Sequence, residues 1–203
     1  MATQHIGGEM FKKWLGQSIL SVTGWRFEGE IIDDPKYILI AAPHTTNWDL
    51  VYMLAVAFVY DIRISWMGKA ELFRGPAGPF MRALGGVPVK RDKARNMVQQ
   101  MVDEFGDRER MILAVPPEGT RSYREHWKSG FYHIAKMSGI RIVPGYLDYS
   151  SKTAGFGPAL TPTDDIATDM ETLRSFYKDK IAKYPDKFCP PRLRDEPPQL
   201  SDG

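Results

Sequence analysis

A histidine and an aspartate stand five positions apart just after an apolar stretch. His44 and Asp49 belong to the segment APHTTNWDL, which follows the run YILIA. On one regular helix, five residues turn the chain through about 500°, which would leave the two side chains about 140° apart. If His44 lies in a loop and Asp49 in the first helical turn, with a cap at residue 46 or 47, the chain bends back. The carboxylate can then accept a hydrogen bond from the imidazole Nδ1, which leaves Nε2 bare as a base.

Such a pair corresponds to the acid and histidine of a serine protease, in which the acid orients the imidazole. No serine nucleophile is embedded in this segment, so the histidine would take its proton from a hydroxyl of the substrate. The alternative is an ordinary helix start, in which Asp49 favours the positive helix terminus and His44 is incidental. The spacing alone does not exclude this alternative.

A second polar segment, VPPEGTRS at residues 115–122, follows the apolar run RMILA. Glu118, Gly119, Thr120 and Arg121 supply an acid, a close backbone approach, a hydroxyl and a forked cation. This set is suited to anchoring a polyol that carries a phosphate. Because a negative Glu118 would not bind phosphate, we assign it to a hydroxyl or to holding Arg121. A simple turn built on proline and glycine is the alternative.

A third candidate is GGVPVKR at residues 85–91, where glycines begin a predicted strand and Lys90 and Arg91 end it. The carboxyl ends of parallel strands meet at one edge of a sheet, so Arg91 can reach the same rim as the two loops above. Charges in solvent at the end of a strand are the alternative.

The elements that must position these residues alternate along the chain. Strands are predicted at residues 37–42, 63–68, 85–91, 110–115 and 140–149, and helices at 49–60, 78–84, 95–105, 130–139 and 164–184. Residues 152–160 could add an edge strand. This alternation predicts a single α/β domain with a mostly parallel mixed sheet flanked by helices on both faces.

Apolar residues recur at helical spacing before the first strand, at Phe11, Trp14, Leu15, Ile19 and Val22. We therefore predict an amphipathic helix and lead-in over residues 1–30, the domain over 31–185, and a Pro-rich, poorly ordered tail over 186–203. The apolar stripe can pack on the domain. Tryptophan and phenylalanine beside paired lysines would also suit the interface of an anionic membrane.

The composition limits the classes of function. The 203 residues, 43% of them hydrophobic, can bury one core, and 27 basic against 25 acidic residues make no strong case for nucleic acid. Residues 62–95 are locally basic, with two acidic residues against eight basic ones: Arg63, Lys69, Arg74, Arg82, Lys90, Arg91, Lys93 and Arg95. Such a patch fits a phosphorylated substrate, anionic lipid or RNA, or a merely solvated face.

Cysteine usage and hydropathy bear on the compartment. One cysteine, Cys189, excludes a disulfide framework or a cysteine-metal cluster and suits a reducing cytoplasm. The start of the chain carries no recognisable export signal, and the longest uncharged apolar run, residues 50–60, is far shorter than the roughly 20 residues that span a bilayer.

Four segments in order, PHTTNWD, GGVPVKR, PPEGTRS and IVPGY, resemble the four blocks of the glycerolipid acyltransferase family, the PlsC-like lysophosphatidic acid acyltransferases. The resemblance runs from Tyr37 to Tyr149 and implies the α/β fold of the glycerolipid-acyltransferase type. It implies transfer of a fatty acyl group, without a covalent enzyme intermediate, to a hydroxyl of a lysophospholipid such as 1-acyl-glycerol-3-phosphate. Acyl-CoA or acyl carrier protein would be the donor, and no metal or cofactor would be needed.

The resemblance also implies roles for individual residues. It makes His44 the general base and Asp49 its orienting acid. It assigns acceptor binding to Lys90, Arg91, Glu118, Gly119, Thr120 and Arg121, and the acyl-site wall to Val143 and Pro144. The histidines at 126 and 133 could suggest a metal pair, but no carboxylate lies at a spacing that completes a site.

The chain departs from the family pattern at several points. Pro43 and Pro116 stand where the family often has Asn and Phe, which could reshape the acceptor pocket. The long hydrophobic N-terminal anchor of many relatives is missing, so we expect a cytoplasmic protein, peripheral on the inner face of the membrane, that binds through residues 10–22 and the basic segment. The alternatives are an acceptor such as a lyso-ornithine lipid, thioester hydrolysis, or lipid binding without catalysis.

Overall fold

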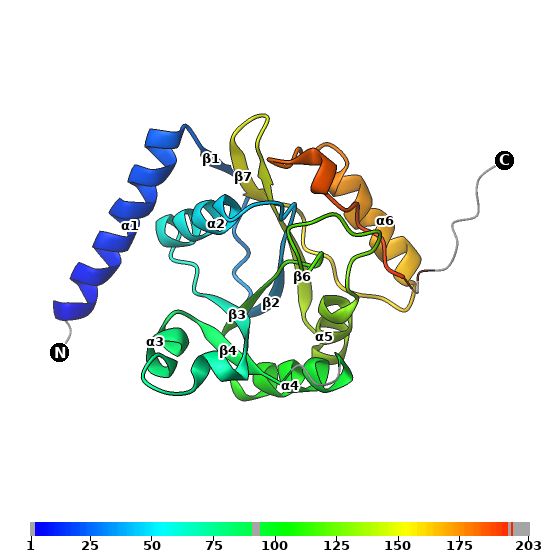
Figure 1. The fold of residues 1–203 in the computed structure, drawn as a ribbon, viewed down its shortest axis with the longest axis horizontal. Coiled ribbons are helices and arrows are strands. Elements are labelled where there is room, and N and C mark those ends of the chain that lie inside the picture. The colour runs from blue at the N-terminus through cyan, green and yellow to red at the C-terminus, as the bar shows by residue number, and fades with distance from the viewer. Residues whose placement is uncertain (1–2, 91–93, 195, 197–203) are drawn as a thin grey trace.

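The computed structural model describes residues 3–90, 94–194 and 196, and it builds them on one seven-stranded sheet (Figure 1). The strand order is β1-β7-β6-β2-β5-β3-β4. The strands are β1 (Arg26–Glu28), β2 (Lys36–Ala41), β3 (Ile64–Lys69), β4 (Gly86–Val89), β5 (Met111–Val115), β6 (Arg141–Asp148) and β7 (Thr153–Phe156). Only β6 and β7 pair antiparallel within this sheet. The prediction of a mostly parallel mixed sheet is confirmed.

The central strand β2 shows why these residues form a covered sheet. Its apolar run is buried on both faces, as expected for a parallel strand with helices on each side. Ile38 and Ile40 belong to a core that includes residues of α4 (Ala94–Asp107), α5 (Gly130–Ser138) and α6 (Ile166–Tyr177). Tyr37 and Leu39 alternate with them and pack with Val143 on the other face.

That other face is covered by α2 (Trp48–Val59), and α1 (Thr3–Thr23) packs beside α2 in Figure 1. Gly16 allows the two helices to approach closely, since a Cβ atom there would lie 2.5 Å from the carbonyl oxygen of Ala55. Leu20 continues the contact in a cluster with Tyr52 and Val56. Among the residues of α1 whose side chains are described, the buried ones lie in its C-terminal half, which packs on the domain.

The remaining elements are short. They are the 3-10 turns η1 (Ala70–Phe73) and η2 (Pro185–Lys187) and the helix α3 (Gly78–Ala83). Within the described residues, no helix combines the length and the apolar character needed to cross a bilayer.

Strand β1 lies in the stretch of residues 1–30 that was predicted as a helix and lead-in. It pairs with β7, so the strand that was expected at an edge lies inside the sheet. The first 30 residues thus contribute a strand to the same sheet as the rest of the domain.

The chain after α6 differs from the predictions. The last helix was expected to reach residue 184, but it ends at Tyr177, because the chain then turns back and the carbonyl of Ile181 accepts a hydrogen bond from Tyr149 N at 2.9 Å. The tail was expected to be poorly ordered. Residues 186–194 instead pack on the domain, where Cys189 is fully buried and Trp127 Nε1 donates to its carbonyl at 2.7 Å. Burial of these apolar groups outweighs the Pro-rich and charged composition of the segment.

Candidate active site

Three loops meet at one edge of the sheet because three adjacent strands run in the same direction. Strand β2 pairs parallel with β5 on one side and β6 on the other. Their carboxyl ends release the segment with His44, the segment with Glu118, and Tyr149. This edge is where open α/β sheets carry ligands and chemistry.

The side chains of His44 and Asp49 face each other across the first loop. The imidazole Nδ1 lies 3.3 Å from Asp49 Oδ2, just beyond the usual N–H···O range of about 2.7–3.2 Å. The carboxylate side chain is only 6% exposed, whereas the histidine side chain is 24% exposed. With Nδ1 turned to the acid, Nε2 is the nitrogen left for a substrate. The predicted bend, with His44 in the loop and Asp49 in the first helical turn, is confirmed.

Asp49 also shapes the loop that holds the histidine. Its Oδ2 accepts hydrogen bonds from the backbone N–H groups of Thr45 at 2.8 Å and Thr46 at 2.9 Å. Its Oδ1 accepts a hydrogen bond from the Tyr149 hydroxyl at 2.7 Å. The start of α2 adds a positive helix terminus to these donors. These donors fix the orientation of a buried acid.

Glu118 lies beneath the histidine rather than at the rim. The residue is 2% exposed, and its Oε1 accepts a hydrogen bond from the backbone N–H of His44 at 3.1 Å. Its other oxygen is buried without a hydrogen-bond donor among the described residues, and burial raises the pKa of this carboxyl from 4.5 to about 7. The bond joins the loops after β2 and β5. In this structure the carboxyl supports His44, where the sequence had suggested a substrate hydroxyl or Arg121.

The raised pKa of Glu118 makes a prediction about stability. Because the folded state holds this proton up to a higher pH than the unfolded chain, stability should fall as the pH rises from about 4.5 to about 7. Glu118→Gln keeps an oxygen for the His44 N–H and removes the titration. In urea unfolding, the free energy of unfolding should fall less between pH 4.5 and pH 8 in the variant than in the unmodified protein. The two decreases should differ by up to about 3 kcal/mol.

A control for this measurement is Glu125→Gln, which changes an exposed glutamate in the same connection between β5 and α5. It should keep the pH dependence of the unmodified protein. An unchanged pH dependence in Glu118→Gln would contradict the assignment.

The rest of this loop has a defined turn. Gly119 has φ +65°, a left-handed conformation that suits glycine, and its N–H donates to the carbonyl of Pro116 at 3.0 Å. A Cβ atom at this position would lie 2.5 Å from the Lys128 ammonium nitrogen, so that lysine extends over the turn. Thr120 Oγ1 accepts a hydrogen bond from Ser122 N at 3.3 Å, and Arg121 is exposed.

Among the described residues, the other predicted ones follow β4 or lie in β6. Lys90 directly follows β4 with an exposed side chain, and its backbone exchanges hydrogen bonds with the Gln100 side chain. Arg91 lies outside the described residues. Val143 and Pro144 are both buried in β6, and Val143 belongs to a cluster with aromatic and aliphatic side chains of β2. Contact of these two residues with an acyl chain stays a prediction.

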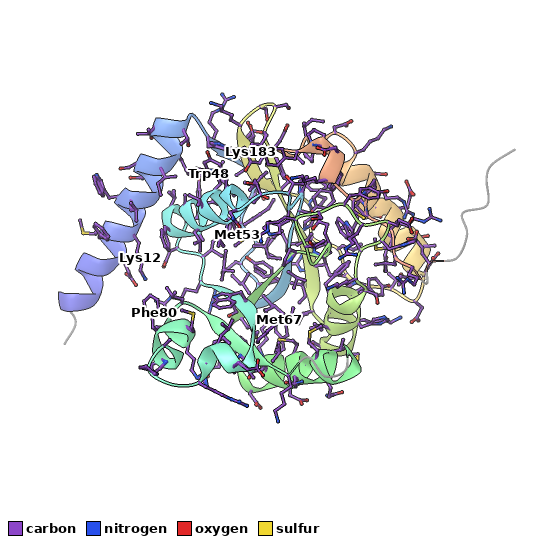
Figure 2. All side chains as sticks on the ribbon, in the orientation of Figure 1. Lys12, Trp48, Met53, Met67, Phe80 and Lys183 are labelled. Atoms are coloured by element: carbon purple, nitrogen blue, oxygen red, sulfur yellow. The ribbon has the colours of Figure 1, made fainter. Side chains whose placement is uncertain are left out.

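Sequence reasoning missed three residues that contact the loops of this edge. They are Tyr149, Lys128 and Lys183, whose ammonium lies 5.5 Å from the centre of the Trp48 ring (Figure 2). Tyr149 follows directly on a strand that neighbours β2, and this position was the signal that could have found it. The two lysines stand in segments without a motif, so only the fold brings them here.

The histidines at 126 and 133 do not share a helix. His126 lies before α5, which begins at Gly130, whereas His133 is exposed within it. Within the described part of the chain, no three His, Cys, Asp or Glu side chains gather in a way that could hold a metal ion.

Comparison with known families adds a second kind of observation to this geometry. A family model described as Acyltransferase matches residues 25–148. The chain belongs to the acyltransferase family. The matched region includes His44, Asp49 and Glu118 and ends one residue before Tyr149. The resemblance inferred from the four sequence blocks is confirmed.

Two acyltransferases illustrate how far the likeness extends. The chain is 33% identical over 114 residues to a 1-acyl-sn-glycerol-3-phosphate acyltransferase of Streptococcus pneumoniae (strain ATCC BAA-255 / R6). That match covers 55% of this chain and 41%, less than half, of the relative. The crystal structure of the 1-acyl-sn-glycerophosphate (LPA) acyltransferase PlsC from Thermotoga maritima matches with a TM-score of 0.57 at 14% identity. The match covers 90% of this chain and 86% of the Thermotoga maritima chain, so the two proteins share a fold.

Proposed function

We propose that this acyltransferase moves a fatty acyl group from a thioester, acyl-CoA or acyl carrier protein, to a hydroxyl of a lysophospholipid such as 1-acyl-glycerol-3-phosphate. The observation that carries the proposal is the His44–Asp49 pair, 3.3 Å apart and held at the carboxyl edge of the sheet. Family membership supports the reaction class. The names of the two relatives support the choice of acceptor.

The proposed reaction uses His44 as a general base. Nε2 takes the proton from the acceptor hydroxyl while the hydroxyl oxygen attacks the carbonyl carbon of the thioester. The carbon–sulfur bond then breaks, and the imidazolium returns the proton to the leaving thiolate. Asp49 stabilises the imidazolium through Nδ1 in the intervening state. The sum is an ester and a free thiol, and the proposed chemistry uses no metal or cofactor.

The attack creates an oxyanion that needs hydrogen-bond donors. The N–H of Gly119 already donates to Pro116, so it is not free in this structure. The start of α2 is the better candidate, because its first N–H groups point out of the helix and the Trp48 N–H has only a 3.4 Å contact with Thr46 Oγ1. We therefore assign the oxyanion to the start of α2.

Cations that follow strands at the carboxyl edge of the sheet support an anionic acceptor. Arg121 and Lys90 are exposed, and Lys128 extends over the turn at Gly119. We assign these side chains, together with Arg91 and Thr120, to the phosphate and glycerol of the acceptor. Val143 and Pro144 are assigned to the wall beside the acyl chain.

A panel of lysolipids tests the proposed function. The full chain is incubated with acyl-CoA or acyl carrier protein and each lysolipid, and the products are read by mass spectrometry. Phosphatidic acid formed from 1-acyl-glycerol-3-phosphate supports the proposal, whereas acylation of only an aminolipid such as a lyso-ornithine lipid replaces its acceptor. Free fatty acid released at the full rate without acceptor indicates hydrolysis. No thioester consumption with any acceptor indicates a lipid-binding protein.

Access to a lipid acceptor is proposed to come from peripheral binding to the inner, cytoplasmic face of a membrane. The N-terminal part of α1 projects beyond α2 in Figure 1, and from residue 10 to the middle of the helix Met10, Phe11 and Trp14 are 68%, 60% and 61% exposed beside Lys12 and Lys13. Large apolar side chains beside lysines are suited to an anionic interface. The exposed half of α1 thus fits lipid better than it fits the domain.

A second exposed group extends this surface. Leu72, Phe80 and Leu84 are more than half exposed around α3, near the exposed Arg74 and Arg82. Figure 1 shows α3 on the same side of the molecule as α1, and Figure 2 marks Phe80 and Lys12 there. The basic segment predicted from the sequence and the N-terminal helix can therefore meet one membrane surface.

Vesicle sedimentation tests this surface. The protein should sediment with phosphatidylglycerol vesicles more than with phosphatidylcholine vesicles, and less at high salt. Replacing Lys12 and Lys13 with alanine should weaken binding to the anionic vesicles by about tenfold to thirtyfold. Met137→Ala, which removes an exposed apolar side chain from α5 on the other face of the sheet, is the control. Equal binding by all three proteins would contradict the assignment.

A further inference from the structure

Tyr149 contacts the half of the Asp49 carboxylate that the histidine loop does not use. Its hydroxyl donates a hydrogen bond to Asp49 Oδ1 at 2.7 Å. The other oxygen, Oδ2, accepts from Thr45 and Thr46 and faces His44 Nδ1. The two oxygens therefore have different roles, since one is fixed by the side chain that directly follows β6 and the other holds the base.

Several elements fix the tyrosine itself. Its backbone N–H donates to the carbonyl of Ile181 at 2.9 Å. Its ring meets Trp25 edge-on at 4.9 Å between centroids and Tyr52 at 6.1 Å, and the Lys183 ammonium lies 6.0 Å from its centre. Such aromatic and cation contacts restrict the ring. Because these contacts come from separate segments of the chain, the hydroxyl has little freedom to leave Asp49.

A hydroxyl fixed in this way limits the carboxylate. A tilt of the Asp49 carboxylate plane about the Cβ–Cγ bond would strain the 2.7 Å bond to Tyr149, so this bond helps to keep one carboxylate oxygen turned to the imidazole. Burial, together with the hydrogen bond to Asp49, raises the pKa of Tyr149 above its usual value. The phenol therefore remains a donor throughout the neutral range.

We propose that Tyr149 is a positioning residue for the acyl transfer, which acts on the reaction by holding Asp49 against His44. This role rests on the proposed function of the His44–Asp49 pair. Tyr149 itself is given no contact with substrate. A hydroxyl that only satisfied a buried carboxylate would affect stability but not the chemical step, and this difference can be measured.

The first test is Tyr149→Phe, which removes the hydroxyl and leaves the ring in its aromatic cluster. The kcat for acyl transfer should fall on the order of tenfold, because a hydrogen bond to a charged group is lost, while KM for donor and acceptor stays unchanged. The matched control is Tyr132→Phe. Tyr132 also has its hydroxyl 2.7 Å from a buried carboxylate, Asp169, but on α5 and α6. It should leave kcat unchanged.

A double-mutant cycle shows whether Tyr149 acts through the acid. If it does, Tyr149→Phe should have no further effect on kcat in an Asp49→Asn background. Full additivity of the two losses would overturn the positioning role.

A spectroscopic readout separates this role from the proposed function. The ¹⁵N chemical shifts of the His44 imidazole, measured on ¹⁵N-histidine protein, should change in Tyr149→Phe and not in Tyr132→Phe. If the unmodified enzyme shows no transfer with any acceptor, the proposed function fails. If it is active while Tyr149→Phe keeps both its kcat and its His44 shifts, only the role of Tyr149 fails.

Discussion

A His44→Ala variant is expected to lose acyl transfer by about a hundredfold to ten-thousandfold in kcat, with every acceptor that the unmodified enzyme uses. The side chain supplies the proposed base, and its Nδ1 faces Asp49. The contact that joins the loop to Glu118 uses the backbone N–H of residue 44, so alanine retains it. Steady-state kinetics with acyl-CoA or acyl carrier protein provide the measurement.

The same variant should keep its fold and its binding to lipid. The His44 side chain is partly exposed, and Asp49 retains its bonds from Thr45, Thr46 and Tyr149 without it. The free energy of unfolding is therefore expected to change by about 0.5 kcal/mol or less. His133→Ala removes an exposed imidazole from α5 and should leave kcat unchanged. Retained turnover in a folded His44→Ala enzyme would exclude the general-base mechanism.

Asp49→Asn is expected to produce a loss of similar size, about a hundredfold to ten-thousandfold in kcat. The amide oxygen can still accept from the N–H groups of Thr45 and Thr46, so the bend is expected to survive. The negative charge that stabilises the imidazolium is lost, because the amide is neutral. KM should change little, because Asp49 is buried and is assigned no contact with substrate.

Asp169→Asn provides the comparison for this variant. Asp169 is equally buried and accepts hydrogen bonds from Tyr132 and Thr163, but it lies on α6. Its replacement changes a buried carboxylate without reaching His44, so it should affect thermal stability and not kcat. A loss of kcat in Asp169→Asn as large as that in Asp49→Asn would mean that both act through stability.

Much of the fold could be predicted because the signals were local. The run at 37–42 became β2, and the alternation of apolar strands with helices required a largely parallel sheet. Parallel strands share the edge of their carboxyl ends, so the loops with His44 and Glu118 had to emerge on the same side. Their direct contact was a further step, since it depends on β5 lying next to β2.

The positions that could not be predicted depend on distant parts of the chain. The prolines and charges of the tail predict poor order, yet Cys189 is buried against Trp127, a residue 62 positions away. Likewise Glu118 belongs to a polar motif that suggests substrate binding. Only the fold shows that it is buried and accepts a hydrogen bond from the His44 backbone. Composition describes a segment by itself, whereas burial is set by the surfaces that fold against it.

The sequence by itself determined the residue types, the five-residue spacing of His44 and Asp49, and the family, because each of these depends on short segments of neighbouring residues. The tertiary structure decided what surrounds the pair. It placed the Tyr149 hydroxyl against Asp49 Oδ1 and the Glu118 carboxyl against the backbone N–H of His44. These partners lie 100 and 74 positions away along the chain, and only the order of strands in the sheet brings them within hydrogen-bonding distance.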